Sequence, residues 1–186
     1  MNWQKFFEQF NFSPDDLLIV VDAQNDFVNG VLRNEHAQKI IPGIAALFKI
    51  FPGRKFCTKD THDENYLDTQ EGKRLPIEHT IVGTHGWQLV DEIKELITDD
   101  DLIINKYTFG STYLFEALMR HHYNRIYFVG LDTGYCVISN VVLAKTADPE
   151  AEVHVIEPLC ACATKESHDT AIKAMETMHV VIDRIE

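Results

Sequence analysis

Apolar residues along the chain gather in six short runs, which predict β-strands. In the first run, Leu17–Asp22, five apolar residues stand in succession, a pattern typical of a strand that is covered on both faces. The six predicted strands are Leu17–Asp22, Lys55–Lys59, Leu102–Asn105, Arg125–Gly130, Glu152–Glu157 and His179–Asp183.

Between these runs, apolar residues recur with the spacing of amphipathic helices. The predicted helices are Ala37–Phe51, Gln88–Ile97, Thr112–His122, Val137–Ala147 and Lys165–Met178. Strands that alternate with helices imply right-handed crossovers, so we predict an α/β fold of three αβα layers around a doubly wound, mostly parallel six-stranded sheet. Ligands bind beyond the carboxyl ends of strands in such sheets, and the residues that follow each strand are the first candidates for a site.

A chain of 186 residues has the length of one domain. We therefore expect a single domain over residues 1–186, with a short helical extension at about 1–12, where Trp3, Phe6, Phe7 and Phe10 follow helical spacing. The irregular stretch 61–87 is longer than the roughly 12–15 residues usual for a connection, and such stretches tend to be functional. It is the expected place for an active-site lid or a metal loop.

The charge of the chain narrows the classes of partner. With 29 acidic and 17 basic side chains the net charge is −12, which would repel nucleic acid and anionic membranes. No stretch approaches the roughly 20 apolar residues of a membrane span, and the N-terminus is too polar for a signal peptide. We expect a cytoplasmic protein that binds neither nucleic acid nor membrane, with its four cysteines as free thiols.

Three of the predicted strands are followed by three different reactive groups. Asp22 closes the first strand, Lys106 follows the third, and Cys136 lies just past the fourth. A cysteine at the start of a helix is expected to have a lowered pKa, and a nearby carboxylate can accept its proton while an ammonium steadies both charges. This combination favours acyl transfer through a thioester.

The motifs around these groups resemble a known family. They are Val21-Asp22-x-Gln24-Asn25-Asp26-Phe27, Lys106-Tyr107-x-Phe109-x-x-Thr112 and Gly130-x-x-Thr133-x-x-Cys136-Val137. The chain resembles the isochorismatase-like cysteine hydrolase superfamily and, within it, the nicotinamidase-like amidohydrolases. The resemblance implies that Asp22 is the general base and acid, Lys106 the electrostatic partner and Cys136 the nucleophile.

The cysteine motif departs from the family pattern at two positions. Gly134 stands where the family usually has an acidic or amide residue, and Asp132 stands where it has a small apolar one. The resemblance also implies a cis peptide bond at Asp132–Thr133. The turn that would stabilise an oxyanion is therefore expected to differ in detail from that of the family.

A second group of candidates follows the second strand. Asp60 and His62, two residues apart in an extended chain, point to the same side, and the long loop can bring His79 to them. One carboxylate and two imidazoles suit Zn²⁺, Mn²⁺ or Fe²⁺, and the resemblance favours a divalent metal, with zinc first, that orients the substrate. His85 is the alternative third ligand. Two further residues could reach the ion through water, Glu64 and Glu78.

Aromatic residues beside these motifs could hold a flat ring between them. The candidates are Phe27, Tyr107, Phe109 and Trp87, to which Thr133 of the cysteine motif is added as a substrate contact.

The activity that the resemblance implies is hydrolysis of nicotinamide to nicotinate and ammonia, a step of NAD metabolism. Another small-amide or ureido hydrolase of the same superfamily, or a non-catalytic binding module, is the alternative. Either enzyme would take a small-molecule amide, and a homo-oligomer is a further expectation because family members are commonly oligomeric.

Overall fold

A computed structural model describes residues 2–185 of the chain. It has one six-stranded sheet in which every pair of neighbouring strands is parallel and the order is β3-β2-β1-β4-β5-β6. The strands are β1 (Leu17–Val21), β2 (Arg54–Asp60), β3 (Leu102–Lys106), β4 (Arg125–Leu131), β5 (Glu152–Ala161) and β6 (Val181–Asp183). The predicted doubly wound α/β architecture is confirmed.

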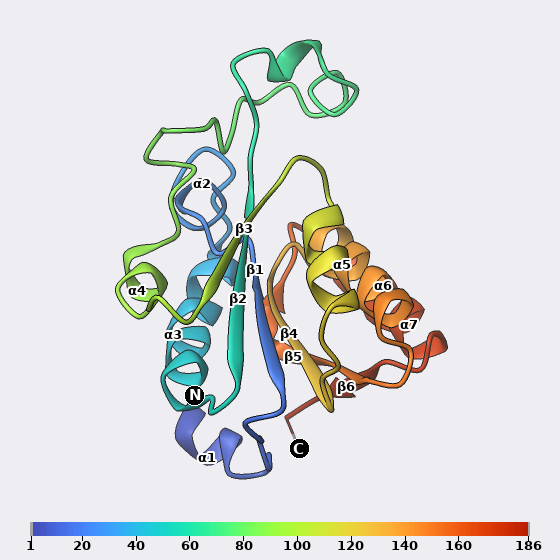
Figure 1. The fold of residues 1–186 in the computed structure, drawn as a ribbon. Helices are drawn as coiled ribbons and strands as arrows, with labels where there is room; N and C mark the ends of the chain where they lie inside the picture. The colour runs from blue at the N-terminus through green and yellow to red at the C-terminus, as the bar shows by residue number, and fades with distance from the viewer. Residues whose placement is uncertain (1, 186) are drawn as a thin grey trace.

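Helices cover both faces of this sheet (Figure 1). One face carries α1 (Trp3–Phe7), α2 (Asn25–Val28), α3 (Glu35–Ile50) and α4 (Asp91–Lys94), and the other carries α5 (Thr112–Met119), α6 (Ile138–Ala147) and α7 (Lys165–Thr177). Each layer of helices packs on the sheet through its own apolar core. None of the helices formed by residues 2–185 has the length and apolar character that crossing a membrane requires.

The two predicted elements that differ most from the observed ones do so for local reasons. The predicted helix Gln88–Ile97 shrinks to the single turn α4, because Leu89 forms a bridge with Gln24 and the backbone N–H of Val90 donates to Ala23. Strand β5 runs beyond the predicted end at Glu157, because an irregularity in its register with β4 lets the strand pass a proline.

The chain reverses its direction of winding between β1 and β4, and this switch point lies next to the ends of both strands. Gly130 of β4 pairs with Val21 of β1 there, with φ at 118°. A Cβ at residue 130 would lie 2.1 Å from the carbonyl oxygen of Val21, so this position requires glycine. The absence of a side chain lets the two strands run close together up to the segments that carry the reactive groups.

The stretch 61–87 projects beyond the carboxyl end of β2, at the top of Figure 1. It contains a short 3₁₀ turn, η1 (Tyr66–Asp68), and returns to the body of the domain through a bridge between His62 and Ile81. The fully buried Tyr66 anchors it, and its hydroxyl donates to the carbonyl of Leu75 at 2.9 Å. The return path of this loop brings its second half back over the end of β2.

Candidate active site

Asp22, Lys106 and Cys136 meet at the carboxyl edge of the sheet. The Nζ atom of Lys106 lies 2.7 Å from Oδ2 of Asp22 and 3.2 Å from Sγ of Cys136. The same ammonium lies 3.0 Å from Oδ1 of Asp60, which pairs with Lys106 in the register of β2 and β3. All four side chains are buried, so a single ammonium stands among two carboxylates and a thiol with little water around them.

The backbone of Asp22 adopts a conformation that side chains other than glycine rarely take. Strand β1 ends one residue before the predicted end, and Asp22 follows it with φ at 48°, in the left-handed region. Its Oδ1 accepts a hydrogen bond of 2.7 Å from the hydroxyl of Thr58, which leaves Oδ2 to face Lys106. Strain of this kind persists where surrounding contacts fix it, and it is concentrated at functional sites.

Burial and charge together set the protonation of these groups. Burial raises the pKa of Asp22, although the Lys106 ammonium opposes the rise. Burial also lowers the pKa of Lys106, but the charges of Asp22 and Asp60 outweigh it and the pKa lies well above its usual value. Lys106 is therefore a permanent cation, and Asp22 is a more basic carboxylate than one in water.

The thiol of Cys136 does not have the lowered pKa that a helix N-terminus predicts. Burial raises its pKa well above the usual value, and the positive charge of Lys106 only partly offsets this. The sequence prediction is wrong because the desolvation of a buried thiolate exceeds the effect of the helix dipole. The raised pKa keeps the proton on the sulfur, which therefore needs a base, and the Asp22 carboxylate contacts the same Lys106 ammonium as the sulfur does.

Cys136 lies in a wide helical turn, η2 (Thr133–Val137), immediately before α6. The carbonyl of Asp132 accepts from the backbone N–H of Val137 at 3.1 Å, five residues further on. Every peptide bond between residues 2 and 185 is trans, so the cis bond expected at Asp132–Thr133 is absent and the backbone keeps the form that a non-proline residue favours.

Asn140, which the sequence did not single out, joins this turn to the segment that follows Lys106. Its amide donates to the carbonyls of Cys136 at 2.7 Å and Phe109 at 3.0 Å, and its oxygen accepts from the N–H of Ser111. The side chain is fully buried. It fixes the spacing between the turn of the cysteine and the strand end that carries the lysine.

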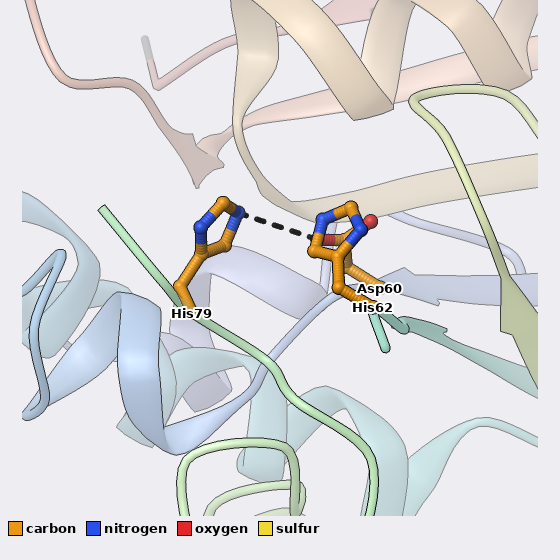
Figure 2. A group of neighbouring side chains, drawn as sticks. All are labelled: Asp60, His62 and His79. Atoms are coloured by element: carbon orange, nitrogen blue, oxygen red, sulfur yellow. Dashed lines mark ion pairs between the residues drawn. The ribbon is translucent and has the colours of Figure 1, made fainter. Parts of the chain in front are cut away.

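The second predicted group also assembles. Nε2 of His62 lies 2.9 Å and Nε2 of His79 lies 3.6 Å from Oδ2 of Asp60, and ligand atoms of the three residues lie within 4.8 Å of one another. Figure 2 shows the His79 imidazole directed toward the Asp60 carboxylate, with the His62 imidazole beside that carboxylate. All three are buried. Asp60 thus faces the Lys106 ammonium with one oxygen and the two imidazoles with the other.

The donor atoms of these three side chains suit a divalent cation. Nδ1 of His79 lies 2.8 Å from the carbonyl oxygen of Ile77, so this nitrogen carries the proton and Nε2 offers its lone pair. Burial lowers the pKa of His62, but the hydrogen bond and the charge of Asp60, 2.9 Å from its Nε2, outweigh this and raise the pKa above its usual value. The charges of Lys106 and His62 hold the pKa of Asp60 below its usual range against the effect of burial, so Asp60 is a carboxylate. Once a metal displaces the proton, one carboxylate oxygen and two imidazole nitrogens are a ligand set for zinc and similar ions.

The loop contributes a carboxylate that the sequence analysis missed. Oε1 of Glu71 lies 3.7 Å from Nε2 of His62, and burial raises its pKa. The residues weighed as further ligands, Glu64, Glu78 and His85, are exposed and lie outside the cluster. No spacing rule points to Glu71, because its approach depends on how the loop turns back at Tyr66.

Gln24 holds the end of β2, which carries Asp60, in place. Its amide accepts from the N–H of Asp60 at 2.7 Å and donates to the carbonyls of Asp60 at 2.8 Å and Trp87 at 2.9 Å. The glutamine lies in the first motif, and its position two residues after Asp22 was the available signal. It links the ends of β1 and β2 to the end of the long loop.

The four candidate aromatic residues lie in different surroundings. Phe27 is half-buried and meets the edge of the His79 ring, with centroids 5.7 Å apart. Trp87 donates from its indole to the hydroxyl of Thr61, and the Lys59 ammonium covers its ring 3.0 Å from the centroid, so that face is closed to a ligand. Tyr107 and Phe109, which follow Lys106, are both exposed. Phe109 packs against Tyr135 of the cysteine turn, with ring centroids 5.4 Å apart.

Thr133 and Asp132 are directed toward the end of β5 and the loop after it. The hydroxyl of Thr133 donates to the carbonyl of Ala161 at 3.1 Å, and Oδ2 of Asp132 accepts from the N–H of Ala163 at 3.2 Å. Burial raises the pKa of Asp132 to about 6. Ionised Asp132 therefore destabilises the folded chain relative to the unfolded one.

Removing the buried charge of Asp132 is therefore predicted to stabilise the fold, by an amount that depends on pH. The pKa of Asp132 is about 6 in the folded chain against 3.8 ordinarily, so the folded state binds the proton more readily and stability falls as the pH rises between these values. We expect Asp132→Asn, whose amide oxygen can still accept from Ala163, to raise the free energy of unfolding by about 1–3 kcal/mol at pH 8 and to change it little at pH 4. Urea denaturation at both pH values measures this.

The matched control is Asp100→Asn, a change at an exposed aspartate. It should leave the free energy of unfolding almost unchanged at either pH. This interpretation would be contradicted if Asp132→Asn were less stable than the native chain at pH 8. It would also be contradicted if the substitution changed the free energy of unfolding by the same amount at both pH values.

Comparison with known proteins gives a consistent result. The family model of the isochorismatase domain matches residues 16–186. The nicotinamidase of Saccharomyces cerevisiae is 27% identical, with 68% of this chain and 80% of that protein covered. A pyrazinamidase of Pyrococcus horikoshii in complex with zinc superposes with a TM-score of 0.77 at 25% identity, over 92% of this chain and 100% of that one. A protein of L. infantum in complex with nicotinate superposes with a TM-score of 0.80 at 22% identity, over 93% of this chain and 94% of that one.

Proposed function

The chain belongs to the isochorismatase family and is a nicotinamidase-like hydrolase, and we propose that its substrate is nicotinamide, which it cleaves to nicotinate and ammonia through a thioester on Cys136. The observation that carries the proposal is the contact of one buried ammonium with a carboxylate at 2.7 Å and a thiol at 3.2 Å. A base, a nucleophile and a fixed positive charge within hydrogen-bond distance are what cysteine-based acyl transfer requires.

The first half of the reaction forms the thioester. Asp22 takes the proton of the Cys136 thiol as sulfur attacks the carboxamide carbon, and the Lys106 ammonium stabilises the negative charge that passes between them. The carbon–nitrogen bond then breaks while Asp22 returns the proton to the departing nitrogen, which leaves as ammonia. The raised pKa of Asp22 suits both transfers, because the carboxylate is basic enough to accept the proton and acidic enough to return it.

The second half regenerates the protein. A water molecule gives a proton to Asp22 and adds to the thioester carbon, the carbon–sulfur bond breaks, and the sulfur recovers its proton from Asp22. Lys106 keeps its charge throughout, because its pKa lies well above the usual value. The three side chains therefore end in the states in which they began.

Asp60, His62 and His79 are the residues that would hold a divalent metal, and Glu71 is a further carboxylate beside them, 3.7 Å from His62. When bound, a zinc ion supplies a Lewis acid that can accept the lone pair of a pyridine nitrogen. Asp60 connects the two centres, since it contacts both Lys106 and the imidazoles. Phe27 beside His79 would then pack against the substrate ring, and Thr133, Tyr107 and Phe109 remain the other candidates for contact with it.

Substrates with a ring nitrogen and a carboxamide fit the two neighbouring sites, the metal ligands Asp60, His62 and His79 for the nitrogen and the thiol of Cys136 for the carboxamide. A second reading is a hydrolase of other small amides or ureido compounds, in which the metal site is only structural. Hydrolysis of nicotinamide would place the protein in NAD metabolism in the cytoplasm, with no partner beyond the small molecule and further copies of the chain.

Ammonia release with and without a chelator tests the proposal. We expect the purified protein to release ammonia from nicotinamide. The rate should fall at least about tenfold after dialysis against a chelator and should be restored by adding zinc. Benzamide, which lacks the ring nitrogen, is the matched control substrate and should react slowly in both states. Release from benzamide equal to that from nicotinamide, unaffected by chelation, would support the second reading instead.

A further inference from the structure

The turn that carries Cys136 is also held by a chain of polar side chains that connects it to β5 and α7. Thr133, the first residue of the turn, is fully buried, and its hydroxyl oxygen lies 3.1 Å from the carbonyl of Ala161 and 2.9 Å from Nδ1 of His168 on α7. The next residue, Gly134, approaches α7 so closely that a Cβ there would lie 2.3 Å from Oγ of Ser167. The turn and α7 are therefore in direct contact.

The hydrogen positions in this chain follow from the partners. A threonine hydroxyl has one proton, and the carbonyl of Ala161 can only accept, so the hydroxyl proton points to that carbonyl. The same oxygen then accepts from His168, whose Nδ1 must carry a proton. The other ring nitrogen of His168 faces Oε1 of Glu157 at 3.5 Å, and Oε2 of Glu157 accepts from Arg184 at 2.8 Å. Each member thus has a defined partner.

We propose that His168 is a positioning residue for the nucleophile: by donating to Thr133 it fixes the turn that sets the distance of the Cys136 sulfur from Lys106 and Asp22. This rests on the proposed function only as far as the nucleophile is concerned. The contacts of His168 are with Thr133 and Glu157, so it acts through the turn. A nucleophile that moves by about 1 Å can lose about a hundredfold in rate, so an anchor of the turn is expected to affect kcat.

The test compares His168→Ala with His168→Asn. The amide of asparagine places a donor close to the position of Nδ1, whereas alanine has none. In His168→Ala we expect kcat for nicotinamide to fall at least about tenfold with KM within about twofold, and His168→Asn to recover most of it. The control is His122→Ala, which removes an exposed imidazole that pairs with Asp148 away from the turn, and it should leave both constants unchanged.

Alkylation of Cys136 by iodoacetamide separates this proposal from the proposed function, because it needs no amide substrate. The thiol is surrounded by the charges of Lys106, Asp22 and Asp60, of which only Lys106 lowers its pKa. In His168→Ala the distance from the sulfur to Lys106 is no longer fixed, so the midpoint of the alkylation pH–rate profile should rise by about one pH unit. In His168→Asn the midpoint should return to the native value. A profile and a kcat that do not differ between the native chain and His168→Ala overturn the proposal.

A double-mutant cycle with Thr133→Val covers the case in which His168→Ala folds poorly. Valine keeps the shape of Thr133 but removes the acceptor, so Thr133→Val should reproduce the loss of kcat, and adding His168→Asn or His168→Ala to it should cause little further loss. Losses that multiply in the double variants would show that His168 acts independently of Thr133, which also overturns the proposal.

Discussion

Replacing Cys136 by alanine is expected to abolish hydrolysis of nicotinamide, with a loss of kcat of about 10⁴-fold or more. Among the side chains of residues 2–185 that contact Lys106, the sulfur is the strongest nucleophile, because the Asp22 and Asp60 carboxylates are ion-paired with the ammonium. Without it no thioester can form, and any remaining rate would come from binding alone. Ammonia release measured with a coupled assay over several hours of incubation determines the loss.

Cys57→Ala is the matched control for this change. Cys57 is also a buried thiol, and burial raises its pKa to about 12, but it lies in the middle of β2 and away from Lys106. The variant should hydrolyse nicotinamide at the native rate. Equal losses in the two variants would indicate damage to the fold, and a Cys136→Ala chain that keeps a tenth or more of the native rate would contradict the assigned nucleophile.

Lys106→Met is expected to lower both activity and stability. The substitution keeps the length of the side chain but leaves the carboxylates of Asp22 and Asp60 buried beside each other without their cation. Removal of one partner from a buried ionic cluster costs about 3–5 kcal/mol. Asp22 would then hold a proton at neutral pH and could no longer accept one from Cys136, so kcat should fall about 10³-fold or more.

The loss of stability in Lys106→Met should depend on pH. Without the ammonium, the pKa values of Asp22 and Asp60 in the folded chain rise above their unfolded values, so the folded variant gains protons and stability as the pH falls from 8 to 5. The deficit relative to the native protein is expected to shrink over this range in urea denaturation. Lys165→Met removes an exposed partner of Asp169 and should cost less than about 1 kcal/mol at either pH, and a similar small effect for Lys106→Met would contradict the account.

The sequence predicted the sheet because its strands are buried on both faces. In β1 all five residues are buried, and such runs of Val, Ile and Leu stand out in a sequence. The approximate meeting of Asp22, Lys106 and Cys136 followed from topology, since the carboxyl ends of parallel strands share one edge. The ends of elements were harder to predict: Asp22 lies outside β1 because its left-handed backbone is a product of its contacts with Thr58 and Lys106.

Contacts that depend on loops could not be predicted from the sequence. Glu71 reaches His62 only because the loop folds around the buried Tyr66, and no local pattern encodes that path. Trp87 carries an aromatic ring beside the site but binds Lys59 and Thr61, contacts that join residues far apart along the chain. The pKa of Cys136 was predicted in the wrong direction because a sequence shows the start of a helix but not the depth of burial.

The most direct test of the account is whether the acyl group becomes attached to Cys136. An activated aryl ester of nicotinic acid has a better leaving group than the amide, which speeds formation of the thioester but not its hydrolysis, so the intermediate should accumulate. We expect a burst of one aryl alcohol per chain and, after acid quenching, a peptide mass spectrum in which the nicotinoyl group is on Cys136 and on none of the other cysteines. Turnover of the ester and of nicotinamide with Cys136 unmodified at every time of quenching would contradict the account.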